Sequence, residues 1–283
     1  MNMRTRIFNK MTAKEVDDYL ARGGNTIFVA VGVVEVHGAA PIDVETIIPE
    51  GFAVAMAEEA DGLAMINLPY FFPGGTVVSN ATVQVSIREG IDYLMMIGRS
   101  LVAQGFRKII FVSGHLPAAL YVNAMLRDFF QETKIHACHM DVSRIAMQSH
   151  YYEGEGFNFQ IFDDMINGSY RILGQEQFLP VDPDTVEMPP MGTPLNPIHV
   201  ELSERLAALG SKMALYYEDG SQHCGGRAFY TEEERAAACE KGEKAVRAMV
   251  KSIDWTRIKN ALDAYQAHVQ EVIKANPRLA GRY

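Results

Sequence analysis

Apolar runs of strand length recur along the first half of the chain. They predict buried strands over residues 26–34 (TIFVAVGVV), 63–68, 108–112 (KIIFV) and 134–142 (KIHACHMDV). Strands that are apolar on both faces lie in the middle of a sheet that is covered on both sides. The pattern therefore predicts a central sheet shielded from solvent.

Helical patterns fill the intervals between these runs. Thr12 and Glu15 form a capping-box pattern at the start of a helix over residues 12–22, and Pro49 fits the first turn of a helix over residues 49–59. The other predicted helices are 87–104, 118–132, 200–208, 232–252 and 255–275. Strands and helices that alternate at this spacing predict parallel βαβ units. We therefore expect an α/β fold with a doubly wound, mostly parallel sheet and helices on both faces.

Two segments lack a clear period. Residues 71–86 are rich in Gly, Pro, Asn and Thr and predict a long loop, and residues 149–197 form a longer irregular segment that resembles an insert. Loops of this length are usually lids or pocket walls, or they are disordered. No repeat, low-complexity tract or Ser/Gly linker divides the chain, so we predict a single domain over residues 1–283.

Composition and charge restrict the classes of partner. The 35 Asp and Glu residues outnumber the 26 Lys and Arg residues and give a formal charge of −9, which argues against a nucleic-acid partner because phosphate binding needs clustered basic residues. The three cysteines lie far apart without a C-x-x-C pair, so neither a disulfide framework nor a structural zinc cluster is indicated. Without an apolar stretch suited to a secretory signal or a membrane helix, we expect a cytoplasmic protein with no membrane partner.

Candidate chemistry follows two of the predicted strands. Glu35 and His37 come directly after the first run, with Glu45 a little further on, and His115 follows the third run. In an open α/β sheet, sites gather at the carboxyl ends of the strands, particularly at a topological switch point. A mixed set of imidazoles and carboxylates suits a divalent metal such as Zn or Mn, with positions left open for water and substrate.

Other histidines compete with this set. His136 and His139 alternate along the fourth predicted strand and are more typical of buried, hydrogen-bonded residues. His223 lies on a glycine-rich loop, where a turn residue is more common than a ligand, and Cys224 beside it has no nearby base to activate a thiol. Further candidates for pocket lining or for contacts with a substrate or a neighbouring subunit are Asp141, Arg144, His150, Tyr151 and Tyr152.

Three motifs resemble those of the creatininase (creatinine amidohydrolase) family. The family motif E-x-H-G-P-H-L-P-x-x-x-D-T is similar to residues 35–46 (EVHGAAPIDVET), with Glu45 at the metal-bridging aspartate when Pro41 is matched to the motif's proline. The motif G-F/W-R-x-I-x-x-x-N-G-H is similar to residues 105–115 (GFRKIIFVSGH), and A-x-x-E-K-G is similar to residues 238–245 (ACEKGEKA).

The resemblance implies a fold, an assembly and a reaction. The fold would be a doubly wound α/β sheet in a homo-oligomer, usually a hexamer. The site would be a two-metal centre that hydrolyses a C–N bond, typically in a small cyclic amide. By position, Glu35 and His115 would hold one metal, His37 the other, and Glu45 both, with Glu45, His115 and Asp164 as the catalytic residues.

Two positions depart from the family motifs. Pro117 stands where the family often has a metal-binding glutamate, and Asn167 stands where a later glutamate is expected, with Asp163 and Asp164 close by. The sequence therefore leaves open one or two ions of Zn or Mn. It favours a metal-dependent hydrolase of a cyclic amide. The alternatives are a hydrolase of a C–C bond in a cyclic diketone from inositol catabolism, and a non-catalytic relative that binds a metabolite.

Overall fold

A four-stranded parallel sheet forms the centre of the protein in the computed structural model. Its strands are β1 (Thr26–Val31), β2 (Leu63–Met65), β4 (Lys108–Ser113) and β5 (Cys138–Asp141), in the order β2-β1-β4-β5. The structure describes residues 3–77, 80–148, 159–186, 194–211, 215–223 and 228–280. Every residue of β1 and β4 is buried, as expected for central strands that are apolar on both faces.

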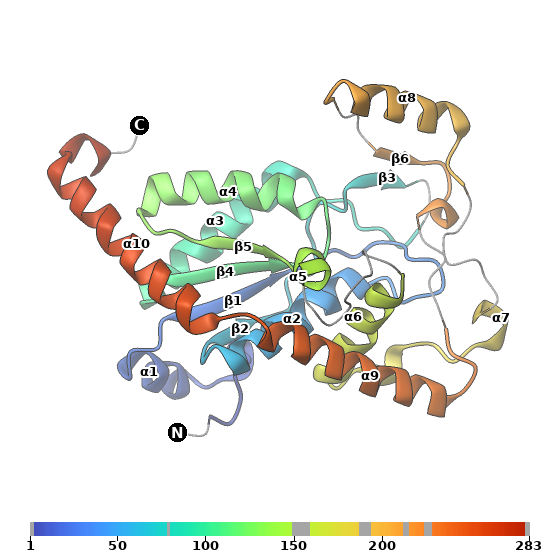
Figure 1. Cartoon of the computed structure of the whole chain (residues 1–283), viewed down its shortest axis with the longest axis horizontal. Coiled ribbons are helices and arrows are strands. Elements are labelled where there is room, and N and C mark those ends of the chain that lie inside the picture. Colours follow the sequence, from blue (N-terminus) through green and yellow to red (C-terminus); the bar gives the residue numbers. More distant parts are fainter. Residues whose placement is uncertain are drawn as a thin grey trace.

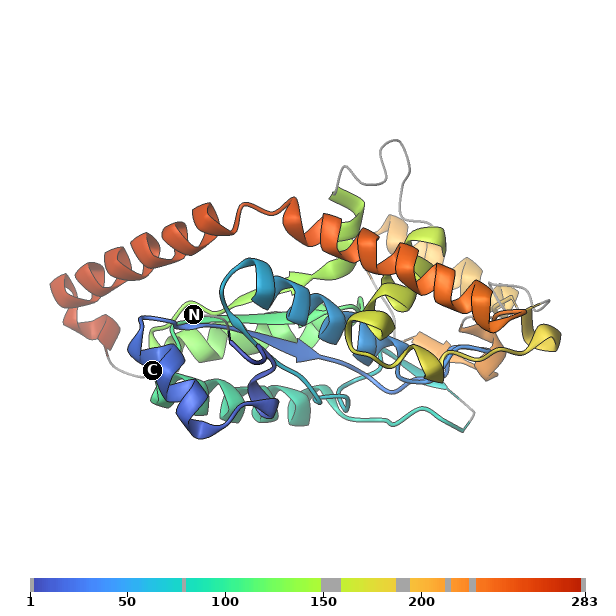
Figure 2. The same ribbon diagram turned by 90° about the horizontal axis from the view of Figure 1, so that it is seen from below.

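Helices cover both faces of this sheet (Figures 1 and 2). One face packs against α2 (Val44–Glu59), α6 (Phe159–Ile172) and α9 (Glu232–Lys251), and the other packs against α1 (Ala13–Ala21), α3 (Ile87–Gln104) and α4 (Ala118–Thr133). Alternate residues of β1 divide between the two cores: Phe28 and Ala30 face the first, and Ile27 and Val29 face the second. The predicted fold class, a doubly wound and mostly parallel α/β sheet, is confirmed.

The helix predicted over residues 49–59 begins earlier than expected. α2 starts at Val44, so Pro49 lies inside the helix instead of in its first turn. An interior proline removes one backbone hydrogen bond, and here the apolar residues on both sides of it are buried and hold the helix together. Fourteen of its residues are buried. As a consequence, Glu45 lies in the first turn of a rigid helix and not on a loop.

The segment predicted to be irregular over residues 149–197 contains a buried helix, α6, with Ile161, Met165 and Tyr170 fully buried. A Cβ atom at Gly168 would lie 2.3 Å from the Gly242 carbonyl, which shows how closely the backbones of α6 and α9 approach. The Gly, Asn and Ser residues in α6 have low helix propensity, and they concealed a helix that tertiary packing stabilises.

A second, two-stranded sheet lies beyond the carboxyl ends of the central strands (Figure 1). Its strands, β3 (Gly75–Val77) and β6 (Leu215–Tyr217), pair in parallel with Gly75 opposite Leu215. The sequence predicted a loop over residues 71–86, because a three-residue strand is too short to show a period. This ladder brings a segment from the second half of the chain next to the end of β1.

The remaining predicted helices are confirmed with small shifts at their ends. α8 (Pro197–Ala208) and α10 (Trp255–Ala275) match the predictions, and α1 has both halves of the expected Thr12–Glu15 capping box. The other short elements among the described residues are α5 (Val142–Gln148), α7 (Pro183–Val186), η1 (Phe8–Lys10), η3 (Glu176–Phe178), η4 (Gly220–Gln222) and η5 (Pro277–Ala280).

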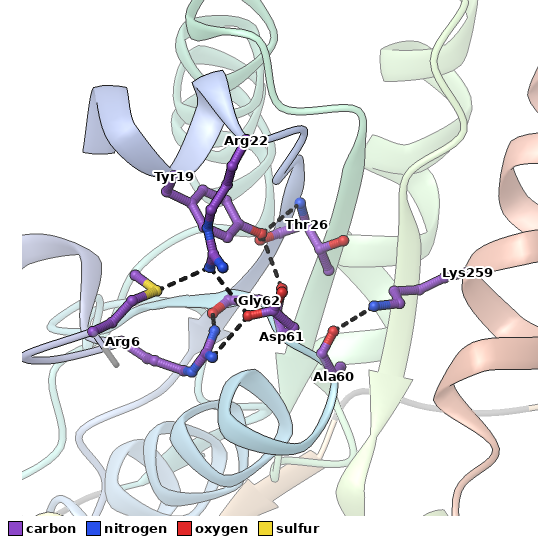
Figure 3. A network of polar contacts seen from close by, with 9 residues as sticks. Arg6, Tyr19, Arg22, Thr26, Ala60, Asp61, Gly62 and Lys259 are labelled. Carbon is purple, nitrogen blue, oxygen red and sulfur yellow. Dashed lines mark hydrogen bonds and ion pairs between the residues drawn. The ribbon is translucent and has the colours of Figure 1, made fainter. Parts of the chain in front are cut away.

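A polar network fixes the amino end of the sheet (Figure 3). The Asp61 carboxylate accepts ion pairs from Arg6 at 2.7 Å and Arg22 at 3.1 Å, and the Tyr19 hydroxyl lies 3.0 Å from the Thr26 carbonyl oxygen. Lys259 of α10 donates to the carbonyl oxygen of the residue before Asp61. These contacts tie α1, β1, the turn after α2 and α10 together, while the carboxyl end of the sheet carries the candidate chemistry.

None of the described helices is long and apolar enough to cross a membrane. The organisation of residues 1–283 as a single domain stays a prediction.

Candidate metal centre

The strand order places a topological switch point between β1 and β4. The chain passes from β1 to β2 on one side and later returns to place β4 on the other side of β1. The connections after these two strands therefore run in opposite directions and leave a crevice at their carboxyl ends, where α/β proteins bind ligands. Glu35, His37 and His115 all come from these two connections.

The connection after β1 is held by backbone hydrogen bonds that position Glu35 and His37. The Glu35 amide donates to the Ile42 carbonyl at 2.9 Å, and the Val36 amide donates to the Thr82 hydroxyl at 3.1 Å. The strand ends at Val31, before Glu35, so strand alternation does not place the side chains of Glu35 and His37 on one face. The hairpin-like return of the loop brings them into one cluster instead.

Glu45 and His115 are fixed by the approach of α2 to the end of β4. A Cβ atom at Gly114 would lie 2.7 Å from a side-chain carbon of Ile48, so only glycine lets the backbone before His115 approach α2 this closely. At the start of α2, the Tyr170 hydroxyl of α6 donates to the carboxylate of Asp43. The helix that carries Glu45 is thereby held from two sides.

Three buried side chains converge at this point: Glu35, Glu45 and His115. Each offers one ligand atom, and these atoms all lie within 4.8 Å of one another. His115 Nε2 lies 3.5 Å from Glu35 Oε2 and 3.5 Å from Glu45 Oε2. His37 Nε2 lies 3.8 Å from the other Glu45 oxygen, Oε1. All four predicted metal ligands are therefore brought together, with each oxygen of Glu45 facing a different imidazole.

The carboxylates of this cluster lack the partners that burial normally requires. Both oxygens of Glu35 and Oε2 of Glu45 are buried and accept no hydrogen bond from the residues that the structure describes. Buried charges are normally paired, hydrogen-bonded or bound to metal. Two converging carboxylates that accept too few hydrogen bonds need a positive charge between them, and a divalent cation supplies it.

Burial and mutual repulsion shift the protonation of these groups. The pKa of Glu45 is raised to about 7, mainly by burial; the charge of His115 lowers it and the charge of Glu35 raises it. Burial lowers the pKa of His37 to about 3, assisted by the neighbouring His223. Burial alone would lower the pKa of His115, but the charges of Glu45 and Glu35 outweigh it and raise that pKa. His37 is therefore a neutral imidazole, the form that binds metal.

His223, which the sequence placed on a glycine-rich turn, reaches the same cluster. Its Nε2 lies 3.9 Å from Glu35 Oε2, and its ring centroid lies 4.6 Å from that of His37. The sequence favours a turn residue at this position, because nothing in a short Gly-rich loop indicates where that loop lies in space. The neighbouring Cys224 lies outside the described residues, as do His150, Tyr151 and Tyr152.

The other candidates make different contacts. Asp164, on α6, pairs with Lys241 of α9 at 3.2 Å and accepts a hydrogen bond from Gln160 at 3.0 Å, and its catalytic role stays a prediction. His139 bonds to Ser113 at 2.8 Å and to Asn123 at 3.0 Å, as expected of a hydrogen-bonded histidine. A Cβ atom on Gly74 would lie 2.3 Å from Pro117, so this proline packs against the loop before β3.

Comparison with known proteins identifies the family. The sequence profile of creatininase, described as creatinine amidohydrolase, matches residues 9–168, which is more than half of the chain. The chain belongs to the creatininase family. The match includes Glu35, His37, Glu45 and His115 and ends before His223.

Solved creatininase structures share the fold of this chain at low sequence identity. A glutamate-to-glutamine mutant creatininase of the Zn–Zn type is 17% identical with a TM-score of 0.56, and a manganese creatininase is 15% identical with a TM-score of 0.57; each match covers 88% of this chain and 98% of the other. A putative creatinine amidohydrolase from Bacteroides fragilis is 17% identical, with a TM-score of 0.57 and coverage of 95% and 98%. Another of these structures is described as a creatininase complexed with creatine. No curated protein sequence matches this chain significantly.

Proposed function

We propose that this protein is a divalent-metal-dependent hydrolase that opens a small cyclic substrate at an amide C–N bond. The observation that carries the proposal is the convergence of Glu35, Glu45 and His115, with three buried carboxylate oxygens that accept no hydrogen bond from described residues. The Zn and Mn creatininases with the same fold support Zn or Mn as the metal.

The residues divide naturally between two ligand positions. Glu35, His115 and Oε2 of Glu45 would hold one cation, and His37 with Oε1 of Glu45 faces the other position. When bound, a divalent cation supplies a Lewis acid that polarises a carbonyl oxygen and makes water more acidic. Glu45 would contribute one oxygen to each position, and burial of Glu35 and Glu45 limits the access of bulk water to both carboxylates.

The experiment is metal analysis combined with a substrate panel. Purified protein is reconstituted with Zn²⁺ or Mn²⁺, its metal content is measured, and hydrolysis of lactams, cyclic imides and cyclic ketones is followed. We expect metal binding in the wild type, hydrolysis of cyclic amides, and loss of metal in Glu35→Ala and His115→Ala. Unchanged metal content in both variants would overturn the ligand assignment, and a metal-loaded protein that opens no member of the panel would overturn the hydrolase.

We also propose a homo-oligomer, a hexamer by resemblance to the family. Helix α8 exposes the apolar side chains of Ile198, Val200 and Leu202, and Leu209 directly after the helix is exposed at 81% of its full area. Apolar groups that gather on a surface in this way commonly mark contacts between proteins. Light scattering after gel filtration measures the mass directly, and a monomer would contradict this assembly.

A further inference from the structure

His223 stands next to the ligand position at which this chain lacks one donor of the family motifs. Pro117 replaces the family's glutamate two residues after His115, and a proline side chain has no atom that can bind a metal. Of the motif residues that the structure describes, His37 and Oε1 of Glu45 face this position. The ring of His223 contacts the ring of His37 there, with the centroids 4.6 Å apart and the planes at 80°.

The hydrogen bond of His223 fixes which of its nitrogens is free. Nδ1 lies 2.7 Å from the Val36 carbonyl oxygen. Because a carbonyl oxygen only accepts, Nδ1 carries the proton, and Nε2 of the neutral ring keeps its lone pair. A histidine that donates one ring N–H to a backbone carbonyl and presents the other nitrogen to a cation is the usual arrangement of a metal ligand.

His37 has the same arrangement. Its Nδ1 faces the Glu35 carbonyl oxygen at 3.3 Å, and its Nε2 points toward Glu45 Oε1. Two imidazoles in contact, each with its Nδ1 directed to the backbone of residues 35–36, thus turn their Nε2 atoms toward a pair of buried carboxylates. His223 Nε2 lies 3.9 Å from Glu35 Oε2, so this ring reaches the edge of the carboxylate cluster beside His37.

We propose that His223 replaces the missing glutamate and holds, together with His37 and Glu45, a second divalent cation. This inference rests on the proposed metal-dependent function, because the first position must also be occupied. The ligand comes from a distant segment: the ladder between β3 and β6 and the short helix η4 bring it to the loop after β1. A histidine in place of a carboxylate also lowers the negative charge of the ligand set by one.

Two substitutions test whether His223 is a metal ligand or a residue that only stabilises a turn. The amide nitrogen of His223→Asn can still donate to the Val36 carbonyl as Nδ1 does, but this variant has no donor atom at the place of Nε2. The exposed His268 of α10 provides the control His268→Asn. Full-length protein is stripped of metal, reconstituted with Zn²⁺, and analysed for bound zinc per chain and for affinity by titration calorimetry.

We expect two zinc ions per chain in the wild type and in His268→Asn, and one in His223→Asn. The affinity of His223→Asn for the second ion should fall by more than about 100-fold. The loss of a residue that only hydrogen-bonds to a metal ligand has a smaller effect. In the His223→Asn background, Pro117→Glu should restore the second ion, which a purely structural role of His223 would not allow.

Failure of the His223 assignment and failure of the proposed function give different experimental results. Two ions retained in His223→Asn, or one ion in the wild type, would overturn the role of His223 and leave the hydrolase intact. A wild type that binds no zinc would overturn the proposed function itself. Circular dichroism and unfolding of the metal-free variants check that a lost ion reflects a lost ligand and not a lost fold.

Discussion

Glu50 is a buried carboxylate on α2 that lies outside the metal-binding cluster. It is 3% exposed and accepts a hydrogen bond of 2.6 Å from the backbone amide of Asn67. Burial raises its pKa from the ordinary 4.5 to about 7, and the charge of Asp43 contributes in the same direction. The folded protein therefore holds the Glu50 proton more tightly than the unfolded chain does.

This shift predicts a pH-dependent cost to stability. Below pH 4.5 the group is protonated in both states and costs nothing. Stability then falls as the pH rises from 4.5 to about 7, by roughly 3 kcal/mol at about 1.4 kcal/mol per pKa unit. Glu50→Gln keeps an acceptor for the Asn67 amide and has no charge. Denaturant unfolding should show it more stable than the wild type at pH 8, with the difference disappearing toward pH 4.5; a constant difference would contradict the assignment.

At the residue scale, the sequence predicted four side chains that converge in the structure, but it favoured a turn role for a fifth, His223. Glu35, His37 and His115 lie in the loops that follow buried strands, and the end of a strand in a parallel sheet has a predictable place. His223 follows a three-residue strand and a 3₁₀ turn, and no local pattern encodes the distance between that turn and the loop after β1.

The crossing of α6 and α9 depends on two glycines. A Cβ atom at Gly242 would lie 2.5 Å from the Asp164 carbonyl oxygen and 2.5 Å from the Gly168 amide nitrogen. These are backbone atoms of a neighbouring helix and cannot rotate away, so an added methyl group forces the helices apart. This close approach gives a structural reason for the glycine in the ACEKGEKA segment.

We expect Gly242→Ala to destabilise the protein by about 2 kcal/mol, although alanine is the better helix former by about 1 kcal/mol. Gly90→Ala in α3 is the matched control, because its nearest neighbour would be a ring atom of Phe71 at 3.3 Å. Chemical denaturation of both variants measures the difference. Equal stability of Gly242→Ala and Gly90→Ala would show that the helices adjust without cost.

A substitution of Asp164 can distinguish a structural role of this residue from a catalytic one. Its side chain is 2% exposed and pairs with Lys241, whose side chain is 54% exposed. Asp164→Asn keeps an acceptor for Gln160 and removes the charge that Lys241 pairs with, and the released lysine can turn to solvent. We expect a loss of about 1–2 kcal/mol in unfolding free energy, with metal content unchanged. A large loss of hydrolysis at unchanged stability would instead support the predicted catalytic role.

At the element scale, the sequence predicted the long elements and missed those that depend on tertiary contacts. β1, β4, α3 and α10 have strong periods or continuous apolar runs, and their predicted positions are confirmed. α6 was missed because its Gly–Ser pair and its glycine-rich flank resemble a loop. The early start of α2 was missed because a proline normally stands at the beginning of a helix, whereas burial on all sides offsets one lost hydrogen bond here.

For the whole molecule, a cation would join segments that are otherwise separate. The ligands come from the loop after β1, the first turn of α2 and the loop after β4. A ligand that binds only the folded state stabilises it by about 2.7 kcal/mol at a hundred times its dissociation constant. For a chain of this size, that corresponds to a rise of about 5–10 °C in melting temperature.

We therefore expect a higher melting temperature in Zn²⁺ than in a metal-free sample with chelator. Scanning calorimetry measures both, and Glu35→Gln, which weakens the cluster without changing its shape, should show little response to zinc. The same melting temperature for the wild type with and without zinc would argue against a site that requires the folded structure.

The short ladder between β3 and β6 has a kinetic consequence. Two strands of three residues each form few hydrogen bonds, and such a pair opens far more often than the central sheet. If His223 holds an ion, that ion can escape each time the ladder opens, while the remainder of the protein stays folded. The residence time of the second zinc ion should then follow amide exchange in β3 and β6, so that the two ions leave one protein at very different speeds.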